Sequence, residues 1–160
     1  MKRISLHWHW RTFEELSRDE LYAILALRQT VFVVEQKCPY LDADGRDPDA
    51  LHLLGADDGG VLRAYLRIVA PGRRFAEPSI GRVVTAREVR GKGLGEQAMQ
   101  EGLRMAALTY PGKAVRISAQ QYLVRFYGKL GFRTTGEPYD EDGIPHIEMV
   151  WFPAHPDGTS

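Results

Sequence analysis

The sequence predicts one α/β domain with a mixed sheet, because a hairpin turn joins two early strands and later strands alternate with helices. The apolar runs at 51–56 and 61–69 are joined by Asp57-Asp58-Gly59-Gly60, which is typical of a hairpin. Strand and helix patterns then alternate from residue 80 onward. With 160 residues the chain has the length of one domain, and we expect a single domain over 1–152 and a flexible tail over 153–160.

The segment before the hairpin predicts a strand, a helix and a loop. Residues 5–10 include alternating His and Trp, a pattern of half-buried strands. Ser17 and Glu20 form a capping box ahead of apolar residues at helical spacing, which predicts a helix over 17–34. Residues 36–48 are rich in Pro, Asp and Gly and predict a loop.

The second half of the chain predicts two helices among four strands. Gly131 is a typical glycine at the end of a helix, and Pro111-Gly112 ends the longer helix that begins near Leu94. The expected elements are a strand at 80–85, a helix from 94 to about 110, a strand at 115–119, a helix at 121–130 and strands at 132–139 and 146–152.

Charge and cysteine content exclude several classes of protein. Lys plus Arg and Asp plus Glu both number 21, so no chain-wide attraction to nucleic acid or to an anionic membrane is expected. No apolar run approaches the roughly 18 to 20 residues that cross a bilayer, and the first ten residues lack the apolar stretch of a signal peptide. Cys38 is the only cysteine, which excludes an intrachain disulfide and fits a cytoplasmic protein.

No metal site is expected. Asp42-x-Asp44-Gly45 begins like a calcium-binding loop, but Arg46 and Leu53 stand where that loop requires further oxygen ligands. The alternation of a strand explains the spacing of His7 and His9 without a metal.

Residues 90–95, RGKGLG, form a glycine-rich turn between a strand and a helix. The start of a helix has unpaired N–H groups and a partial positive charge, glycines leave such groups accessible, and Arg90 and Lys92 add positive charge. The turn therefore predicts a pyrophosphate site, with ordinary turn glycines as the alternative. Lys92 is not followed by Ser or Thr, which excludes a P-loop, and Glu96 and Ala98 disfavour a dinucleotide fingerprint.

Two motifs resemble one known family. Arg90-x-x-Gly93-x-Gly95 is similar to the R/Q-x-x-G-x-G/A pyrophosphate loop of the GCN5-related N-acetyltransferase (GNAT) superfamily, and QYLVRFYGKLGF, residues 121–132, resembles its second acetyl-CoA-binding segment. LALRQTVFVVEQKCPYLDADG and YDEDGIPHIEM further resemble the ElaA-like branch. The resemblance implies an α/β fold with a mixed, mostly antiparallel central sheet, flanked by helices and splayed between the two central strands to admit acetyl-CoA.

The resemblance also implies that acetyl-CoA is the co-substrate and that main-chain groups hold it. A backbone N–H near Val83 or Val84 would stabilise the oxyanion. The residues implied in binding are Val83, Val84, Thr85, Arg90, Gly91, Lys92, Gly93, Leu94, Gly95, Phe126 and Tyr127.

Tyr127 matches the tyrosine of the family's F-Y segment, which implies a general acid that protonates the leaving sulfur; the alternative is a packing aromatic. Many members carry a glutamate base on the strand before the pyrophosphate loop, but this strand has Arg82 instead. Glu35, His52 and His146 remain candidate bases, and direct attack by a neutral amine or a water chain needs none.

The implied function is acetyl transfer from acetyl-CoA directly to an amine of a small molecule or peptide. Two alternatives remain. One is a non-catalytic CoA-sensing module, and the other is an acyltransferase resembling acyl-homoserine-lactone synthases, whose N-terminal region also carries the R-x-x-V-F pattern that runs here from Arg28 to Phe32. Arg28 would either clamp a substrate carboxylate or tie its helix to the next loop, and we favour the second. A homodimer is left open.

Overall fold

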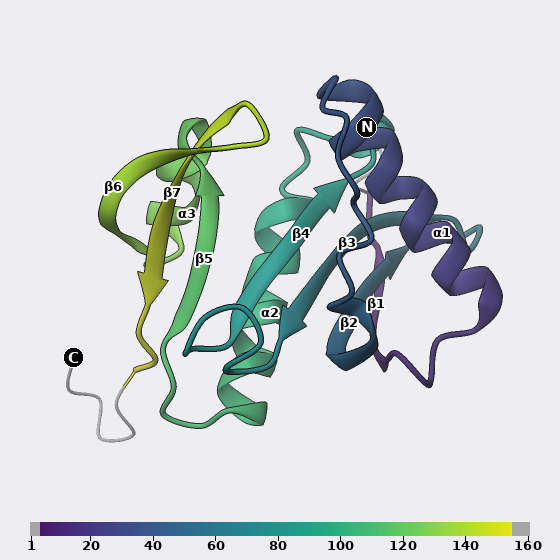
Figure 1. The fold of residues 1–160 in the computed structure, drawn as a ribbon. Coiled ribbons are helices and arrows are strands. Elements are labelled where there is room, and N and C mark those ends of the chain that lie inside the picture. Colours follow the sequence, from purple (N-terminus) through teal and green to yellow (C-terminus); the bar gives the residue numbers. More distant parts are fainter. Residues whose placement is uncertain (1–3, 155–160) are drawn as a thin grey trace.

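The computed structural model of the chain describes residues 4–154, in which two antiparallel sheets stand side by side. Both sheets and the order of their strands can be followed in Figure 1. The mixed α/β fold expected from the sequence is confirmed. The first sheet has the order β1-β2-β3-β4, with β1 (His7–Thr12), β2 (Ala50–Ala56), β3 (Leu62–Val69) and β4 (Ser79–Thr85). The second has the order β5-β7-β6, with β5 (Val115–Gln120), β6 (Arg133–Glu141) and β7 (Ile144–Trp151).

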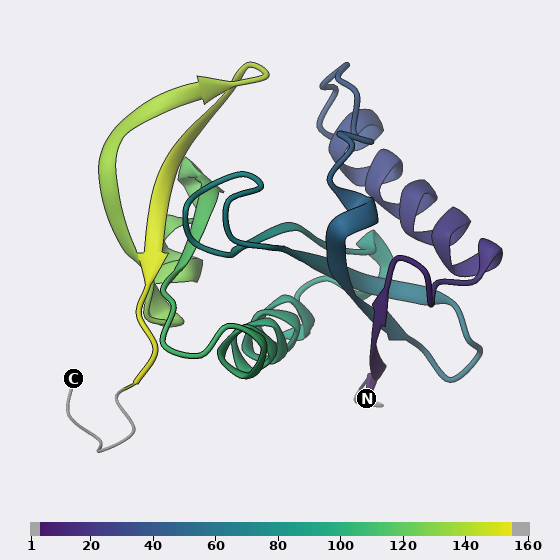
Figure 2. The same ribbon diagram turned by 60° about the horizontal axis from the view of Figure 1, so that its bottom comes forward.

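Helices cover both faces of the first sheet, as Figure 2 shows. Alternation along the strands explains this arrangement, because Leu53 and Leu66 share one core cluster with α2 (Leu94–Thr109) while Leu54 and Tyr65 share another with α1 (Arg18–Arg28). The remaining helices are η1 (Gln29–Glu35), η2 (Asp47–Asp49), η3 (Arg87–Val89), η4 (Gln121–Leu123) and α3 (Val124–Lys129). No helix of residues 4–154 is long and apolar enough to cross a bilayer.

The helix expected over 17–34 is present but changes type part of the way along. Ser17 caps it as expected, because its hydroxyl accepts a hydrogen bond from the Glu20 amide at 3.0 Å while the Glu20 carboxylate accepts one from the Ser17 amide at 2.9 Å. The α-helix ends at Arg28, and residues 29–35 form the π-helix η1. β-Branched residues at 30, 31, 33 and 34 crowd the preceding turn of an α-helix, which favours a wider one.

A main-chain hydrogen bond joins the two sheets at one end of β4 and β5. The Arg116 amide, at the start of β5, donates to the Pro78 carbonyl, just before β4, at 3.1 Å. In the rest of their described length the two strands have no ladder of hydrogen bonds, since they belong to separate sheets. The strands therefore diverge, as the resemblance implied. The expected tail at 153–160 lies outside the described residues from 155 onward.

Candidate active site

A cavity of about 750 Å³ lies between the diverging strands. Residues 80–85 of β4 form one wall, and Ile117, Ser118 and Gln120 of β5 form the facing wall. The end of η1, the loop at 38–46 and the turn between β6 and β7 also contribute to the lining. The volume lies within the range of small-molecule sites, about 300–1,000 Å³.

β4 carries a bulge at the centre of its wall. Tyr65 pairs with Val84 and Arg67 pairs with Gly81, so two residues of β4, Arg82 and Val83, lie opposite Leu66. Arg82 has a φ of +53°, a left-handed conformation that is uncommon for a residue with a side chain. An extra residue in one strand disrupts the ladder locally, so main-chain groups at 82–83 are released from pairing with β3.

The glycine-rich turn places an uncapped helix start beside the cavity. Gly93 is the residue before α2, with a φ of +78°, and no side chain caps the helix. Gly91 also has positive φ, and no atom lies within 4 Å of the Cβ position at either glycine. The start of α2 thus has no side-chain cap and lies in a region of partial positive charge. Arg90 lines the cavity, whereas Gly91 to Gly95 lie outside its lining.

Tyr127 of α3 reaches the cavity from the opposite sheet. Its side chain is largely buried and contacts the rings of Phe126 and Phe132 edge-on, with ring centroids 5.0 and 5.8 Å away. Burial raises the pKa of Tyr127 to about 12, so the phenol holds its proton at neutral pH. Phe126 does not line the cavity; its ring lies 3.7 Å from the Cβ position of Gly95 and supports the start of α2.

His146 is the histidine that lines the cavity. It lies on β7 opposite Gln120, and its Nδ1 is 2.7 Å from the Ile144 carbonyl oxygen. Because a carbonyl oxygen only accepts, Nδ1 carries the proton and Nε2 is the basic nitrogen. Nε2 lies 3.3 Å from a Glu141 carboxylate oxygen.

His52 is not brought to the cavity. It lies on β2, almost fully buried, with Nε2 donating to the Asp47 carbonyl at 3.0 Å and Nδ1 accepting from the Tyr65 hydroxyl at 2.7 Å. Both ring nitrogens are thus used, and burial lowers the pKa of the ring. His52 has a structural role here, which corrects its assignment as a candidate base.

Glu35 lines the cavity but is paired with the pyrophosphate loop. Its Oε2 accepts from Nη2 of Arg90 at 2.6 Å, and Nε of Arg90 donates to the Thr85 carbonyl at 3.2 Å. The structure therefore places Glu35 beside the arginine expected to contact the pyrophosphate, rather than beside His146 or Tyr127.

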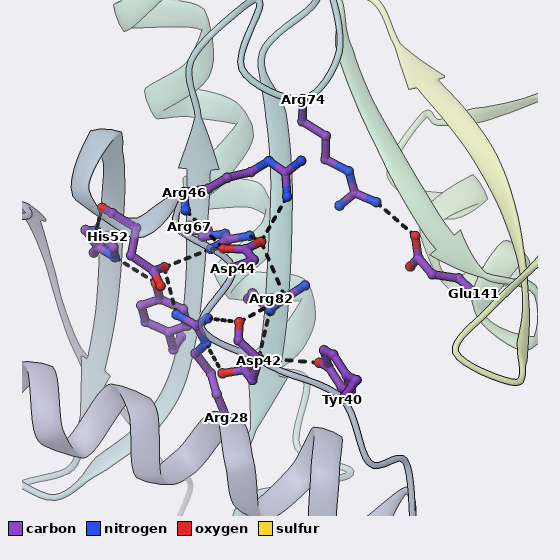
Figure 3. Close-up of polar contacts among 12 residues, drawn as sticks. Arg28, Tyr40, Asp42, Asp44, Arg46, His52, Arg67, Arg74, Arg82 and Glu141 are labelled. Carbon is purple, nitrogen blue, oxygen red and sulfur yellow. Dashed lines mark hydrogen bonds and ion pairs between the residues drawn. The ribbon is translucent and has the colours of Figure 1, made fainter.

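A buried network of arginines and aspartates forms the base of the cavity, and Figure 3 shows its contacts. We call it the Arg–Asp network; its members are Arg28, Asp42, Asp44, Arg46, Asp47, Arg67 and Arg82. Arg28 is fully buried and donates to Asp42 and to Asp47, in both cases at 2.8 Å. The interpretation that Arg28 ties its helix to the following loop is confirmed.

Arg67 connects the same loop to β3. It donates from Nη2 to Asp44 at 2.5 Å and from Nη1 to Asp47 at 2.8 Å. Burial by itself would raise the pKa of Asp44, but the Arg67 guanidinium outweighs it and the pKa lies well below its usual value. Arg82 pairs with Asp42 at 2.9 Å and with Asp44 at 3.4 Å, so the network also holds the residue at the bulge.

This network was not predicted from the sequence. Asp42 and Asp44, which suggested and then failed a calcium pattern, bind arginines instead. A signal was present: Arg67 interrupts an apolar strand, and a buried guanidinium needs carboxylate partners. The aspartate-rich loop at 42–49 supplies them.

Comparison with known proteins agrees with this fold. A model of the family described as "Acetyltransferase (GNAT) domain" matches residues 43–152. Protein ElaA of Escherichia coli (strain K12) is 42% identical over 147 residues, which cover 91% of this chain and 95% of ElaA. A crystal structure of an acyl-CoA N-acyltransferase from Pseudomonas aeruginosa has a TM-score of 0.87 and 46% identity, covering 92% of this chain and 99% of that one.

The fold is that of a GNAT acyl-CoA N-acyltransferase, a class that uses acyl-CoA donors. This chain belongs to the GNAT superfamily and to its ElaA-like branch. The crystal structure of Escherichia coli ElaA has a TM-score of 0.86 with 41% identity, covering 92% of this chain and 99% of that chain.

Proposed function

We propose that the protein is an N-acetyltransferase that moves an acetyl group from acetyl-CoA directly to an amine of a small molecule or peptide. Residues 1–152 act as one domain in this proposal, and the protein works in the cytoplasm. The observation that carries the proposal is the uncapped start of α2 beside a cavity between β4 and β5, with Tyr127 on its wall.

The glycine-rich turn fits the diphosphate of acetyl-CoA. Positive φ at Gly91 and Gly93 and the open space at their Cβ positions let an anion approach the first amides of α2. Arg90 and Lys92 supply positive charge at the same turn. Val83, Val84 and Thr85 line the cavity wall along which the pantetheine arm would run.

Acetyl-CoA supplies the thioester; the chain supplies hydrogen-bond donors and proton transfer. The bulge releases main-chain groups of β4 from the ladder, so an N–H near Val83 is available to stabilise the developing oxyanion. His146 takes the amine proton on Nε2, and Glu141 stabilises the resulting imidazolium. Tyr127, protonated at neutral pH, gives its proton to the departing sulfur.

Replacing Tyr127 with Phe is expected to lower turnover about 100-fold or more, the usual contribution of a general acid, without weakening acetyl-CoA binding. The ring contacts with Phe126 and Phe132 remain in this variant, so packing is preserved. Steady-state rates and a binding titration would separate the two effects. Tyr122→Phe removes a hydroxyl from another, exposed point of the cavity wall and serves as the control. Unchanged turnover in Tyr127→Phe would exclude the acid role.

Release of CoA thiol over a panel of amino acids, polyamines, aminoglycosides and peptide amines tests the function itself. Amine-dependent release supports the proposal. Saturable acetyl-CoA binding without release under any acceptor would indicate the CoA-sensing alternative. A requirement for acyl chains longer than acetyl, with S-adenosylmethionine as co-substrate, would indicate an acyltransferase like the acyl-homoserine-lactone synthases.

A further inference from the structure

We propose that the amine acceptor also carries a carboxylate, and that Arg46 and Arg74 bind this group inside the cavity. The inference rests on the proposed acetyl transfer and names its substrate class: amino acids recognised through their free carboxylate. Arg46 comes from the loop before η2 and Arg74 from the connection between β3 and β4, and both line the cavity.

Arg46 and Arg74 use fewer of their hydrogen-bond donors than Arg28 and Arg67 do. A guanidinium has five N–H donors. Arg28 donates from all three of its nitrogens, and Arg67 makes three hydrogen bonds to two carboxylates. Among residues 4–154, by contrast, the side chain of Arg46 makes one hydrogen bond, to Asp44 at 3.2 Å, and that of Arg74 makes one, to Glu141 at 3.2 Å. Most of their donors have no partner among these residues and remain available to a ligand.

The exposure of the two side chains to solvent agrees with a role in ligand binding. The side chains of Arg46 and Arg74 are 39% and 22% exposed, whereas that of Arg67 is 1% exposed. Figure 3 shows both side chains extending beyond the buried part of the network, with Arg74 directed toward Glu141. Nε of Arg46, like Nε of Arg67 and of Arg82, is buried and has no hydrogen-bond partner in the described part of the chain.

The charge of the Arg–Asp network favours one negative charge in the ligand. Its four guanidinium groups, on Arg28, Arg46, Arg67 and Arg82, face three carboxylates, on Asp42, Asp44 and Asp47. Arg74 and Glu141 neutralise one another. A carboxylate matches the surplus of one charge, and the planar fork of an arginine fits it in two-pronged fashion.

The amine of such a ligand would lie near His146, the proposed base. Glu141 contacts both Arg74 and His146, so the site for a carboxylate lies close to the histidine proposed as base. An amino acid has its ammonium and carboxylate groups on one carbon atom. That short spacing suits a site in which one glutamate touches both the arginine and the histidine.

Ligand-binding measurements test the inference without turnover. N-acetyl amino acids, the expected products, and their C-terminal amides would be titrated into the CoA-loaded protein by ligand-observed NMR. We expect acids to bind at least about 10-fold more tightly than amides, because charge-assisted hydrogen bonds exceed neutral ones. Arg46→Gln and Arg74→Gln should remove this preference, and Gln can still hydrogen-bond to Asp44 or Glu141.

Arg73→Gln is the matched control, because Arg73 precedes Arg74 in the chain, is 60% exposed, pairs weakly with Asp49 and does not line the cavity. It should keep the preference for acids. Equal binding of acids and amides, no binding of any acid, or a preference that survives both cavity variants would overturn the inference. Acid-selective binding without thiol release from any acceptor would keep the carboxylate site and reject acetyl transfer. Thiol release that is equal for amino acids and their amides would do the reverse.

Discussion

Gly93→Glu is expected to abolish acetyl-CoA binding, with an affinity loss of at least about 100-fold. The Cβ position of Gly93 faces open space at the start of α2, so the new carboxylate would project into the region proposed for the diphosphate. It would repel that anion, and it would also compete for the same amides, because carboxylates are themselves favoured at a helix start. Isothermal titration with acetyl-CoA measures the loss.

A second glycine separates this effect from backbone strain. Gly112 follows α2, has a φ of +74° and likewise has no atom within 4 Å of its Cβ position. Gly112→Glu therefore imposes the same left-handed conformation on a residue with a side chain, at a cost of about 1–2 kcal/mol, but far from the helix start. It should bind acetyl-CoA normally. If Gly93→Glu also retained the parent affinity, the diphosphate would not lie at this turn.

Local signals explain which parts of the molecule were predictable from the sequence. The capping box at Ser17, the hairpin at 57–60 and the glycines at 91–95 each act within a few residues of chain, and the structure has the corresponding cap, turn and helix start. The switch from α-helix to π-helix at Gln29 was missed, because apolar spacing alone does not distinguish two neighbouring helical periods.

Long-range pairing was not predictable in the same way. Arg67 meets Asp44 and Asp47 from 23 and 20 residues away, and Arg82 meets Asp44 from 38 residues away. Nothing in a single sequence assigns these partners. The same reason explains His52, whose chemistry permits a base but whose position on β2 turns it toward Tyr65 and the network.

Arg67→Met is expected to lower the free energy of unfolding by about 3–5 kcal/mol, the usual cost of removing one partner from a buried ion pair. Asp47 would lose one of its two arginines, and Asp44 would lose its shortest hydrogen bond, while both remain largely out of water. Urea denaturation followed by circular dichroism measures the change. Arg67→Lys, which keeps the charge without the two-pronged geometry, should give an intermediate loss.

Arg63→Met is the matched control for this prediction, since Arg63 lies on the same strand and pairs with Asp57 at 2.9 Å, but its side chain is 28% exposed. Solvent can replace that pair, so a loss of no more than about 1 kcal/mol is expected. Equal losses in the two variants would mean that the network contributes no more than a surface pair.

A larger loss for Arg67→Met has a consequence for catalysis as well. Asp44 also contacts Arg82 at the bulge of β4, so weakening the network should disturb the main-chain donors proposed at Val83 and slow the proposed acetyl transfer in whatever fraction remains folded.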